Sequence, residues 1–309
     1  MDNQIKELVN KYSNVFGDNP SIEKINVGFT NTLYDIDNKY ILKVCTDLNN
    51  EPSFNNEIDF YKNNIDNKYI PKLLLSDTSK IDIPYLYEVL EKVEGVSLYN
   101  VWHTLTESTR EDIIKQLCTA LKGFHKDKKP SYDWLEYQQN VFNEYYLKTK
   151  DLFKSEEQEI IEEAYNEFYK YLDTNTDFAF LHNDLHFDNI FYHNGEIKII
   201  DFERAIYGPL DFELDILYRM VRNPSKYASE ETEQYTKKED YAHIMEYMQK
   251  YYPELFTNPH LKERFIIYDI IYYLGNLVDF PHVKELNEII LKACKDLLGG
   301  NYENYNISR

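Results

Sequence analysis

The side chains whose types and spacing best fit a chemical role lie between Leu181 and Glu203, in the run L-H-N-D-L-H-F-D-N-I-F-Y-H-N-G-E-I-K-I-I-D-F-E. Within this segment, Asn194-Gly195 stands between two apolar, β-prone runs, residues 190–192 and 197–200. An Asn-Gly pair in that setting is the sequence signal for a two-residue hairpin turn. We therefore expect the two runs to pair as antiparallel strands.

The register of this hairpin brings two oxygen-bearing side chains together. Counting outward from the turn pairs His193 with Glu196 and places Asn189 opposite Ile200, next to Asp201. A carboxylate and an amide oxygen at one point form a hard-oxygen site that suits Mg²⁺, which keeps most of its coordination for water and substrate phosphates. The sequence predicts that Asn189 and Asp201 bind a Mg²⁺ ion shared with a nucleotide.

Asp184 precedes Asn189 by five residues, in a segment expected to be a loop. From there its carboxylate could face a hydroxyl group that approaches the γ-phosphate of the nucleotide. Asp184 is therefore the candidate catalytic base of a phosphoryl transfer.

The pattern H-N-D-x-x-x-x-N followed by D-F-E resembles the catalytic loop and the metal-binding loop of the protein-kinase-like fold. The asparagine and the second histidine of H-N-D-L-H make it more similar to the aminoglycoside phosphotransferase family than to protein kinases. The resemblance implies that Asp184 is the base, that Asn189 and Asp201 hold Mg²⁺, and that His182 supports the loop. It also implies ATP or GTP as the phosphate donor.

A second matching segment is V-G-F-T-N-T-L-Y-D-I, residues 27–36, which resembles the nucleotide-binding loop of that family. Gly28 would let backbone N–H groups approach a phosphate. The side chains of Thr30, Asn31 and Thr32 could add hydrogen bonds to its oxygens. By itself the segment could equally be an ordinary turn.

Two further nucleotide contacts follow from the same resemblance. Lys43, in I-L-K-V, would contact the α- and β-phosphates, and an ion pair with Glu57 would hold it extended toward them. The segment L-Y-E-V-L-E-K-V-E-G, residues 86–95, resembles the hinge that pairs with the nucleobase. The hinge contacts would come from the backbone of Glu91 and Val93.

Two motifs later in the chain extend the resemblance over roughly residues 22–217. The run A-L-K-G-F-H ends in His125, which we interpret as a packed structural histidine. The run Y-G-P-L-D-F-E-L-D-I-L resembles the segment beyond the metal loop, where Asp215 would brace the catalytic loop.

The elements around these motifs predict an α+β, bilobal protein-kinase-like fold. Residues 1–94 should form a small, antiparallel β-rich N-lobe with one main helix, and residues 95–309 a larger, mostly helical C-lobe. In the N-lobe we expect a helix over residues 4–16, strands at 25–27, 32–36, 39–44, 73–76 and 86–90, and the main helix over 54–63. A Ser108-x-x-Glu111 capping box should open the first long helix of the C-lobe.

Composition limits the partners. The chain has 309 residues and a formal net charge of -20, which disfavours nucleic acid and suits a cationic small molecule. Its three cysteines have no metal or redox spacing and predict reduced core thiols. The chain has no signal-peptide pattern and no membrane-spanning run, so we expect a cytoplasmic protein, a monomer or weak dimer.

The acceptor is the part of the reaction that the sequence defines least. Residues 95–309 carry 38 acidic against 24 basic side chains, which favours an aminoglycoside and hence an antibiotic-resistance enzyme. Asp269, Glu230 and Glu231 are the candidate acceptor contacts. The alternatives are a metabolite kinase for choline, homoserine or a modified sugar, and a nucleotide-binding pseudokinase that has lost phosphoryl transfer.

Overall fold

A computed structural model describes residues 1–25, 31–172 and 177–305. The chain divides into two compact units, which we treat separately. The first comprises Met1–Ala120, His182–Ile206 and Pro224–Asp240, and the second Leu121–Leu181, Tyr207–Asn223 and Tyr241–Arg309. The boundary expected between residues 94 and 95 stays a prediction.

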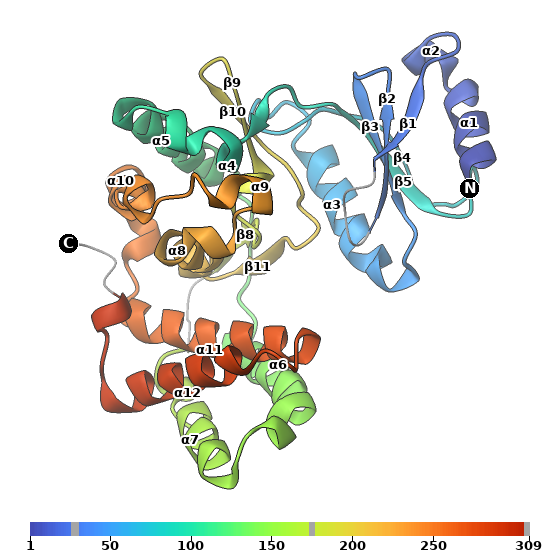
Figure 1. The fold of residues 1–309 in the computed structure, drawn as a ribbon. Helices are drawn as coiled ribbons and strands as arrows, with labels where there is room; N and C mark the ends of the chain where they lie inside the picture. The colour runs from blue at the N-terminus through green and yellow to red at the C-terminus, as the bar shows by residue number, and fades with distance from the viewer. Residues whose placement is uncertain (26–30, 173–176, 306–309) are drawn as a thin grey trace. The chain divides into compact units, whose positions relative to one another are not determined.

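A five-stranded antiparallel sheet organises the first unit, with strand order β1-β2-β3-β5-β4 (Figure 1). Its strands are β1 (Ile22–Ile25), β2 (Thr32–Ile36), β3 (Tyr40–Cys45), β4 (Leu73–Asp77) and β5 (Leu86–Glu91). Alternation of side chains along a strand gives the sheet two distinct faces. Which face a residue joins therefore follows from its position along the strand.

One face of this sheet packs against α1 (Asp2–Lys11) and the short α2 (Ser13–Phe16). The apolar core there includes Ile5 and Leu8 of α1 with Leu42, Val44 and Val89 of the sheet. The opposite face packs against α3 (Glu51–Asn63), as Figure 1 shows. A separate core there joins Phe54 and Ile58 of α3 to Cys45 and Leu86.

The predicted hairpin is confirmed, including its register. It joins β9 (Ile190–His193) to β10 (Glu196–Ile199), with His193 opposite Glu196 and Ile190 opposite Ile199. Both turn residues have positive φ, 48° at Asn194 and 89° at Gly195, as a type I′ turn requires. Beyond the last pair, the Ile200 N–H donates to the Asn189 carbonyl at 3.0 Å. The two ends of the hairpin thus lie where the sequence placed them.

The short strand β6 (Val96–Ser97) adds to this hairpin, giving the order β10-β9-β6. Gly95, which precedes it, has φ 95° and packs directly against the backbone of Tyr192. The remaining helices of the first unit are α4 (Leu98–Val101), α9 (Glu230–Glu233) and the greater part of α5 (Glu107–Phe124).

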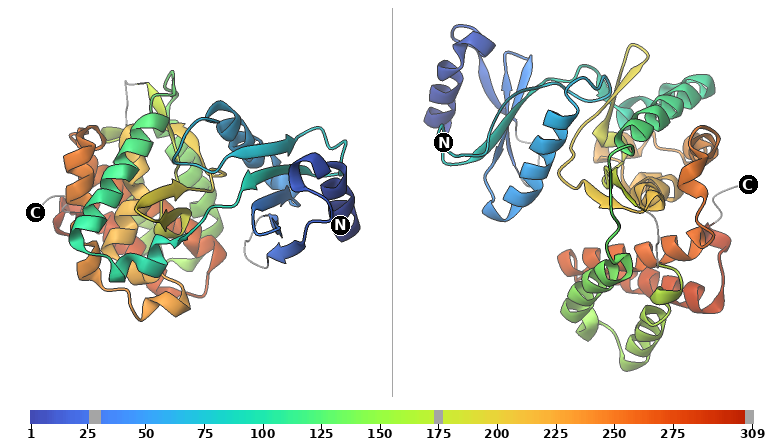
Figure 2. Two further views of the ribbon diagram at one scale, coloured as in Figure 1. Left: turned by 90° about the horizontal axis from the view of Figure 1, so that it is seen from above. Right: turned by 180° about the vertical axis from the view of Figure 1, so that it is seen from behind.

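Helices dominate the second unit, in which α11 packs against both α6 and α12, and α12 against α7 (Figure 2). The helices are α6 (Trp134–Thr149), α7 (Ser155–Tyr165), α8 (Leu214–Arg222), α10 (Ile244–Tyr251), α11 (Leu261–Asp279) and α12 (Lys284–Gly299). A small sheet of order β11-β8-β7 accompanies them, formed by β7 (Lys128–Lys129), β8 (Phe178–Leu181) and β11 (Ile206–Gly208).

The structure corrects several expected boundaries. The helix expected over residues 4–16 is broken at Tyr12 into α1 and α2, and the main helix begins at Glu51, with a proline in its first turn. The first strand is β1, Ile22–Ile25, whereas residues 26 and 27 of the expected strand lie outside the described residues.

The expected capping box is wrong. Helix α5 already begins at Glu107, so Ser108 lies inside its first turn. The cap is instead Thr106, whose hydroxyl accepts a hydrogen bond from the Thr109 N–H at 3.3 Å.

Two expectations from composition can be compared with the structure. Cys45, Cys118 and Cys294 are all buried, and none of the three is part of a disulfide among the described residues. Among the described residues, no helix is both long and apolar enough to cross a lipid bilayer.

Candidate active site

The loop after β8 is fastened by His182, which is fully buried. Its Nδ1 accepts the Asp184 N–H at 3.2 Å, and its Nε2 lies 2.9 Å from the Ile200 carbonyl oxygen. These two contacts fit one neutral tautomer, with the proton on Nε2. His182 therefore ties the loop that holds Asp184 to the end of β10, immediately before Asp201.

Asn183 makes a second connection between the same two segments. Its backbone has φ 59°, a left-handed conformation that asparagine tolerates better than most residues. From that position its side-chain N–H donates to the Arg204 carbonyl at 2.9 Å. The turn of the loop is thus set by contacts on both sides of Asp201.

The side chain of Asn189 is oriented by the loop that it closes. Asn189 Nδ2 donates to the Asp184 carbonyl at 2.9 Å, and only 7% of the residue is exposed. Because the amide nitrogen is used in this bond, the amide oxygen is the atom suited to bind a metal ion. The Asp184 carboxylate is 19% exposed and lies 3.9 Å from His186 Nε2.

Lys43 is the centre of the charged part of the site. Its Nζ lies 2.6 Å from Glu57 Oε2 and 3.3 Å from Asp201 Oδ1, and it also pairs with Glu203. Burial alone would lower the pKa of Lys43, yet the carboxylates of Glu57, Asp201 and Glu203 hold that pKa well above its usual value. Lys43 is therefore a permanent cation among three acids.

The expected ion pair between Lys43 and Glu57 is present, and Glu57 has a further role. Its Oε1 accepts the Phe202 N–H at 3.1 Å, while Oε2 faces Lys43. Burial raises the pKa of Glu57 to about 7, although the charge of Lys43 favours the ionised form. Glu57 thus links helix α3 both to Lys43 and to the segment that contains Asp201 and Phe202.

Asp201 lies in a left-handed backbone conformation, with φ 66°. Such a conformation costs of order 1–3 kcal/mol outside glycine and persists only where neighbouring structure enforces it. Phe202 provides that enforcement, because its buried ring stacks on Phe60 at 3.9 Å and contacts His182. Burial would raise the pKa of Asp201, but Lys43 lowers it, so the carboxylate is ionised and suited to a cation.

Glu203 completes a group of acids that sequence reasoning did not assign. One ligand oxygen each from Glu57, Asp201 and Glu203 lies within 4.8 Å of the others. Glu203 also accepts hydrogen bonds from Asn31, one of the predicted nucleotide-loop residues, and from Asn50 at 3.2 Å. Its partners Asn31 and Asn50 are distant in the sequence, so no local pattern indicated this role.

These oxygen donors suit a hard divalent cation. The side chain of Glu57 is almost fully buried, at 1% exposed, whereas the side chains of Asp201 and Glu203 are 43% and 11% exposed. Asp201 and Glu203 are therefore the carboxylates better placed to hold Mg²⁺. The amide oxygen of Asn189 would be a third ligand.

The other residues predicted to contact the nucleotide lie in or next to the strands of the first unit, or outside the described residues. Thr32 begins β2 and lies opposite Val44, one residue from Lys43. Gly28 and Thr30 lie outside the described residues. Glu91 ends β5 and Val93 follows it outside regular structure, so the hinge contacts stay a prediction.

The acceptor candidates lie in different units. Asp269, in α11 of the second unit, is 3% exposed, and its oxygens lie 3.2 Å from Arg219 Nε and 2.6 Å from Arg222 Nη2. Tyr305 also donates to it at 2.9 Å. These partners account for its burial without a ligand.

Glu230 and Glu231 belong to α9, in the same compact unit as Asp184. Glu231 is exposed to solvent. The role of all three acids toward an acceptor stays a prediction.

Two other residues named from the sequence have structural partners in the second unit. His125 contacts Glu213 and Tyr252, each at 2.9 Å, as expected for a packed histidine. Asp215 forms an ion pair with Arg219, within α8. Its role as a brace of the catalytic loop stays a prediction.

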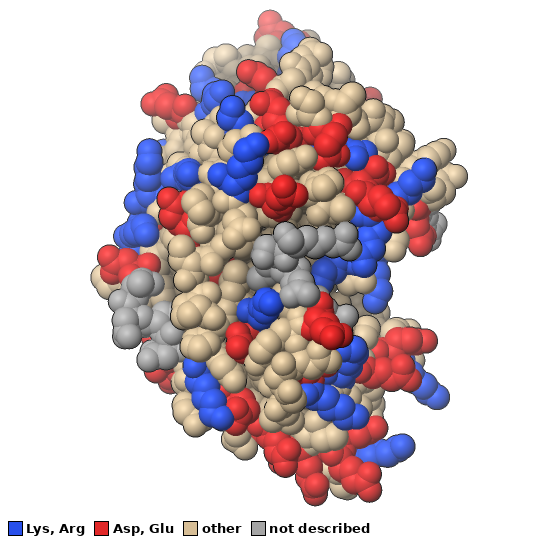
Figure 3. Space-filling view, turned by 90° about the vertical axis from the view of Figure 1, so that its left-hand side faces the viewer, with Lys and Arg blue, Asp and Glu red and all other residues tan. Residues whose placement is uncertain are grey.

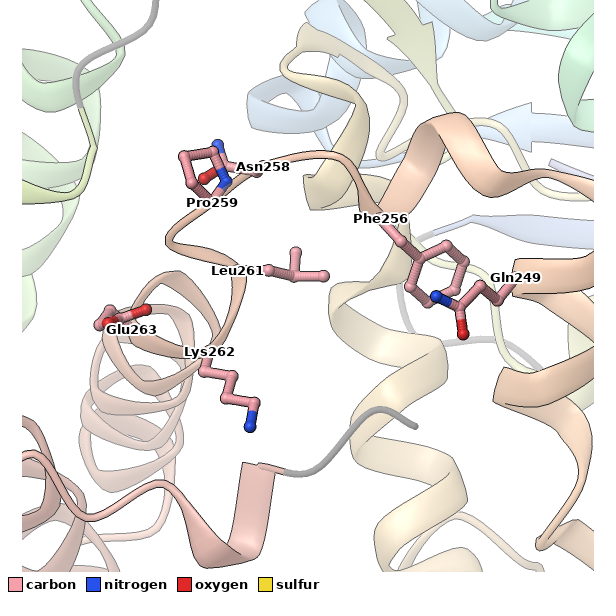
Figure 4. Close-up of a pocket in the computed structure, with 7 residues that line it drawn as sticks. All are labelled: Gln249, Phe256, Asn258, Pro259, Leu261, Lys262 and Glu263. Atoms are coloured by element: carbon pink, nitrogen blue, oxygen red, sulfur yellow. The ribbon is translucent and has the colours of Figure 1, made fainter. Parts of the chain in front are cut away.

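One pocket of the second unit contains none of the predicted site residues. It has a volume of about 290 Å³ and is shown in Figure 4. Its lining residues are Gln249, Phe256, Asn258, Pro259, Leu261, Lys262 and Glu263. These lining residues do not combine a base, a nucleophile and a metal ligand in one place, so we propose no catalytic role for this pocket.

Comparison with known proteins defines the class to which this fold and site belong. The chain is a member of the phosphotransferase enzyme family (APH), whose sequence pattern matches residues 21–247. No curated protein has a sequence that matches the chain.

Solved structures of aminoglycoside phosphotransferases share its fold. The gentamicin complex of APH(2″)-IIa has a TM-score of 0.65 at 16% identity, with 99% of this chain and 98% of that chain covered. The ADP-bound APH(2″)-Ib has a TM-score of 0.63 at 17% identity, with 97% of this chain and 98% of that chain covered. The GDP complex of wild-type aminoglycoside 2′-phosphotransferase-IIIa has a TM-score of 0.66 at 12% identity, with 97% of this chain and 99% of that chain covered.

The expected fold is confirmed. It is the α+β, protein-kinase-like fold, with an N-terminal antiparallel sheet and a helical C-terminal lobe.

Proposed function

We propose that this protein is a Mg²⁺-dependent kinase that transfers the γ-phosphate of ATP or GTP to a hydroxyl group of an aminoglycoside. The observation that carries the proposal is the double contact of Lys43 with Glu57 and Asp201, at 2.6 and 3.3 Å. It occurs in the same compact unit as the loop that holds Asp184 and Asn189. A phosphate-contacting lysine, a metal-binding acid and a base are the parts that phosphoryl transfer needs.

Each residue has a distinct part in this proposal. Asp184 accepts the proton of the acceptor hydroxyl as that oxygen attacks the γ-phosphorus. Lys43, held by Glu57, binds and orients the α- and β-phosphates. Asp201, Glu203 and Asn189 would hold Mg²⁺, which when bound neutralises charge on the phosphates.

The intact set of groups argues against the pseudokinase alternative. His182 and Asn183 hold the Asp184 loop against the segment that contains Asp201, by contacts of 2.9 Å each. Such preorganisation has value for a reaction that depends on positioning.

The choice of an aminoglycoside as the acceptor rests on the net charge of the chain and on its similarity to solved aminoglycoside phosphotransferases. The net charge of -20 favours a polycationic acceptor. On the face in Figure 3, acidic and basic side chains are interspersed, so this face has no extended patch of one sign. Carboxylates close to the reacting groups would attract such an acceptor, with Glu231 a candidate.

The test is a panel of acceptors assayed by release of nucleoside diphosphate, with ATP and with GTP. The panel contains gentamicin, kanamycin, streptomycin, choline, homoserine and simple sugars. We expect diphosphate release that depends on an aminoglycoside and on Mg²⁺. Release with choline or homoserine alone would assign the metabolite-kinase alternative, and tight nucleotide binding with no release would assign the pseudokinase.

A further inference from the structure

Glu88 is a buried acid for which the proposed site gives no role. It lies in β5, directly opposite Lys43 of the neighbouring strand β3. Its exposed fraction is 0%, and within the described residues neither of its carboxyl oxygens has a hydrogen-bond partner. Buried polar groups without partners are rare in folded proteins and cost stability, so this one calls for a reason.

The direction of the Glu88 side chain follows from the strand pattern. Tyr87 and Val89 belong to the core beneath α1, whereas Leu86 belongs to the core beneath α3. Because side chains alternate along a strand, Glu88 faces α3 together with Leu86 and Lys43. Glu57 projects from α3 on this side, where it meets Lys43.

An ionised Glu88 would have to share the charge of Lys43 with other acids. Lys43 is already paired with Glu57, Asp201 and Glu203, so four acids surround one lysine. A buried carboxylate without a partner is strongly destabilising, and such a group takes up a proton instead. Burial, with the nearby charge of Glu57, raises the pKa of Glu88 well above its usual value.

A neutral Glu88 has a hydrogen-bond donor to offer. A protonated carboxyl carries one O–H group, and each oxygen of an ionised carboxylate can accept two hydrogen bonds. Glu57 uses one bond to Lys43 through Oε2 and one from the Phe202 N–H through Oε1. It can therefore accept a further bond.

We propose that Glu88 is a positioning residue of the nucleotide site, a neutral acid whose O–H donates to Glu57 and so keeps Lys43 extended toward the phosphates. The inference rests on the proposed function, since it assigns Lys43 to nucleotide binding. It explains why an acid occupies a core position that leucine would fill with more stability. Glu88 acts through Glu57 and does not touch the substrate.

The experiment compares Glu88→Leu with Glu88→Gln, which keeps the shape and an N–H donor. The proposal predicts that Glu88→Leu has a higher Tm than the wild type but weaker binding of Mg²⁺·ADP, by about tenfold. Glu88→Gln should bind within about twofold of the wild type. Glu23→Gln, at an exposed position of β1 in the same sheet, is the matched control and should change neither quantity.

Two measurements separate this inference from the proposed function. Binding of Mg²⁺·ADP by calorimetry needs no acceptor, so it decides the role of Glu88 even if no acceptor is turned over. Infrared spectroscopy at a pH above the pKa of Glu57, which is about 7, should show the carbonyl band of a protonated carboxylic acid, lost in Glu88→Gln. Unchanged ADP affinity in Glu88→Leu, equal damage in Glu88→Gln, or the absence of that band would each overturn the proposal.

Discussion

Lys43 shows how a single residue joins distant parts of this chain. Its partners come from α3 and from the segment after β10, separated from it by 14 and by 158 residues. Each partner also bonds elsewhere, Glu57 to the Phe202 N–H and Glu203 to Asn50. The charged groups therefore form one connected network, and loss of one member should affect the rest.

Replacement of Asp184 by Asn tests the base directly. The change keeps the shape but removes the proton acceptor, so turnover should fall by roughly two to four orders of magnitude. Affinity for the nucleotide should stay nearly unchanged, because Asp184 has no part in holding it. The measurements are kcat by diphosphate release and the Kd of ADP, and unchanged turnover would remove Asp184 from this role.

Replacement of Asp201 by Ala tests the metal site. In the proposed function Asp201 would hold Mg²⁺, so the loss of this carboxylate should weaken metal-nucleotide binding and catalysis together. Glu203→Gln should also weaken metal binding, so that a higher Mg²⁺ concentration is needed for half-maximal activity than in the wild type. Titrations of activity with Mg²⁺ measure both effects, with the exposed Glu196→Gln as the control. A normal metal dependence in Asp201→Ala would contradict the assignment.

The same residue scale explains what the sequence could and could not predict about the site. Asp184, Asn189 and Asp201 lie within 18 residues and share one local hairpin, so their relation follows from spacing. Glu88 and Lys43 are 45 residues apart in sequence and meet only because β3 pairs with β5. Glu203 likewise gains its role from contacts with Asn31 and Asn50. Long-range pairing of this kind has no local signal.

At the scale of elements, the hairpin was predictable to the residue because an Asn-Gly turn fixes its own register. The ends of helices were less predictable. Helix α5 begins after Thr106, whose hydroxyl accepts a hydrogen bond from the Thr109 N–H, and not at Ser108, which the sequence pattern favoured. The packing of α1 and α3 on opposite sheet faces also depends on strand order, which periodicity alone does not give.

Gly95→Ala tests the contact between β6 and the hairpin. A Cβ at this position would overlap the Tyr192 carbonyl oxygen, and φ is 95°, a value that L-residues rarely adopt. The unfavourable backbone conformation alone should lower the free energy of unfolding by about 1–2 kcal/mol. The steric overlap with Tyr192 should lower it further. Gly299→Ala, where a Cβ meets nothing within 4 Å, is the matched control. Equal Tm values for the two variants would show that the contact is not tight.

Asp82 anchors α1 to the sheet, and its effect should depend on pH. The side chain pairs with Lys11 and accepts hydrogen bonds from Tyr12 at 2.6 Å and Tyr87 at 2.8 Å. These bonds, that from Lys11 first, lower the pKa of Asp82 to about 2. Because the folded pKa lies below the unfolded one, the stabilisation is present above about pH 4 and is lost as the pH falls toward 2.

Asp82→Asn should therefore lower the free energy of unfolding by about 1–3 kcal/mol at pH 7. The difference from the wild type should shrink between pH 4 and pH 2. Urea unfolding at several pH values measures it, with the exposed Asp18→Asn as the control. A difference that stays constant down to pH 2 would show that the Asp82 carboxylate is not the stabilising group.

At the scale of the whole molecule, the predicted nucleotide and metal residues that the structure describes fall in the first compact unit, together with Asp184. The second unit, with its bundle of α6, α7, α11 and α12, holds Asp269 in a buried network with Arg219 and Arg222. The residues proposed for phosphate-donor chemistry thus share one unit.

Transfer of a phosphoryl group to a small-molecule hydroxyl by this protein can be followed by ³¹P NMR of a complete reaction. With Mg²⁺, ATP or GTP, and an aminoglycoside, we predict a new phosphate-monoester signal on the acceptor that grows in step with nucleoside diphosphate. The signal should be absent with Asp184→Asn over the same time. Inorganic phosphate as the sole product, or no loss of triphosphate with any acceptor of the panel, would contradict the account.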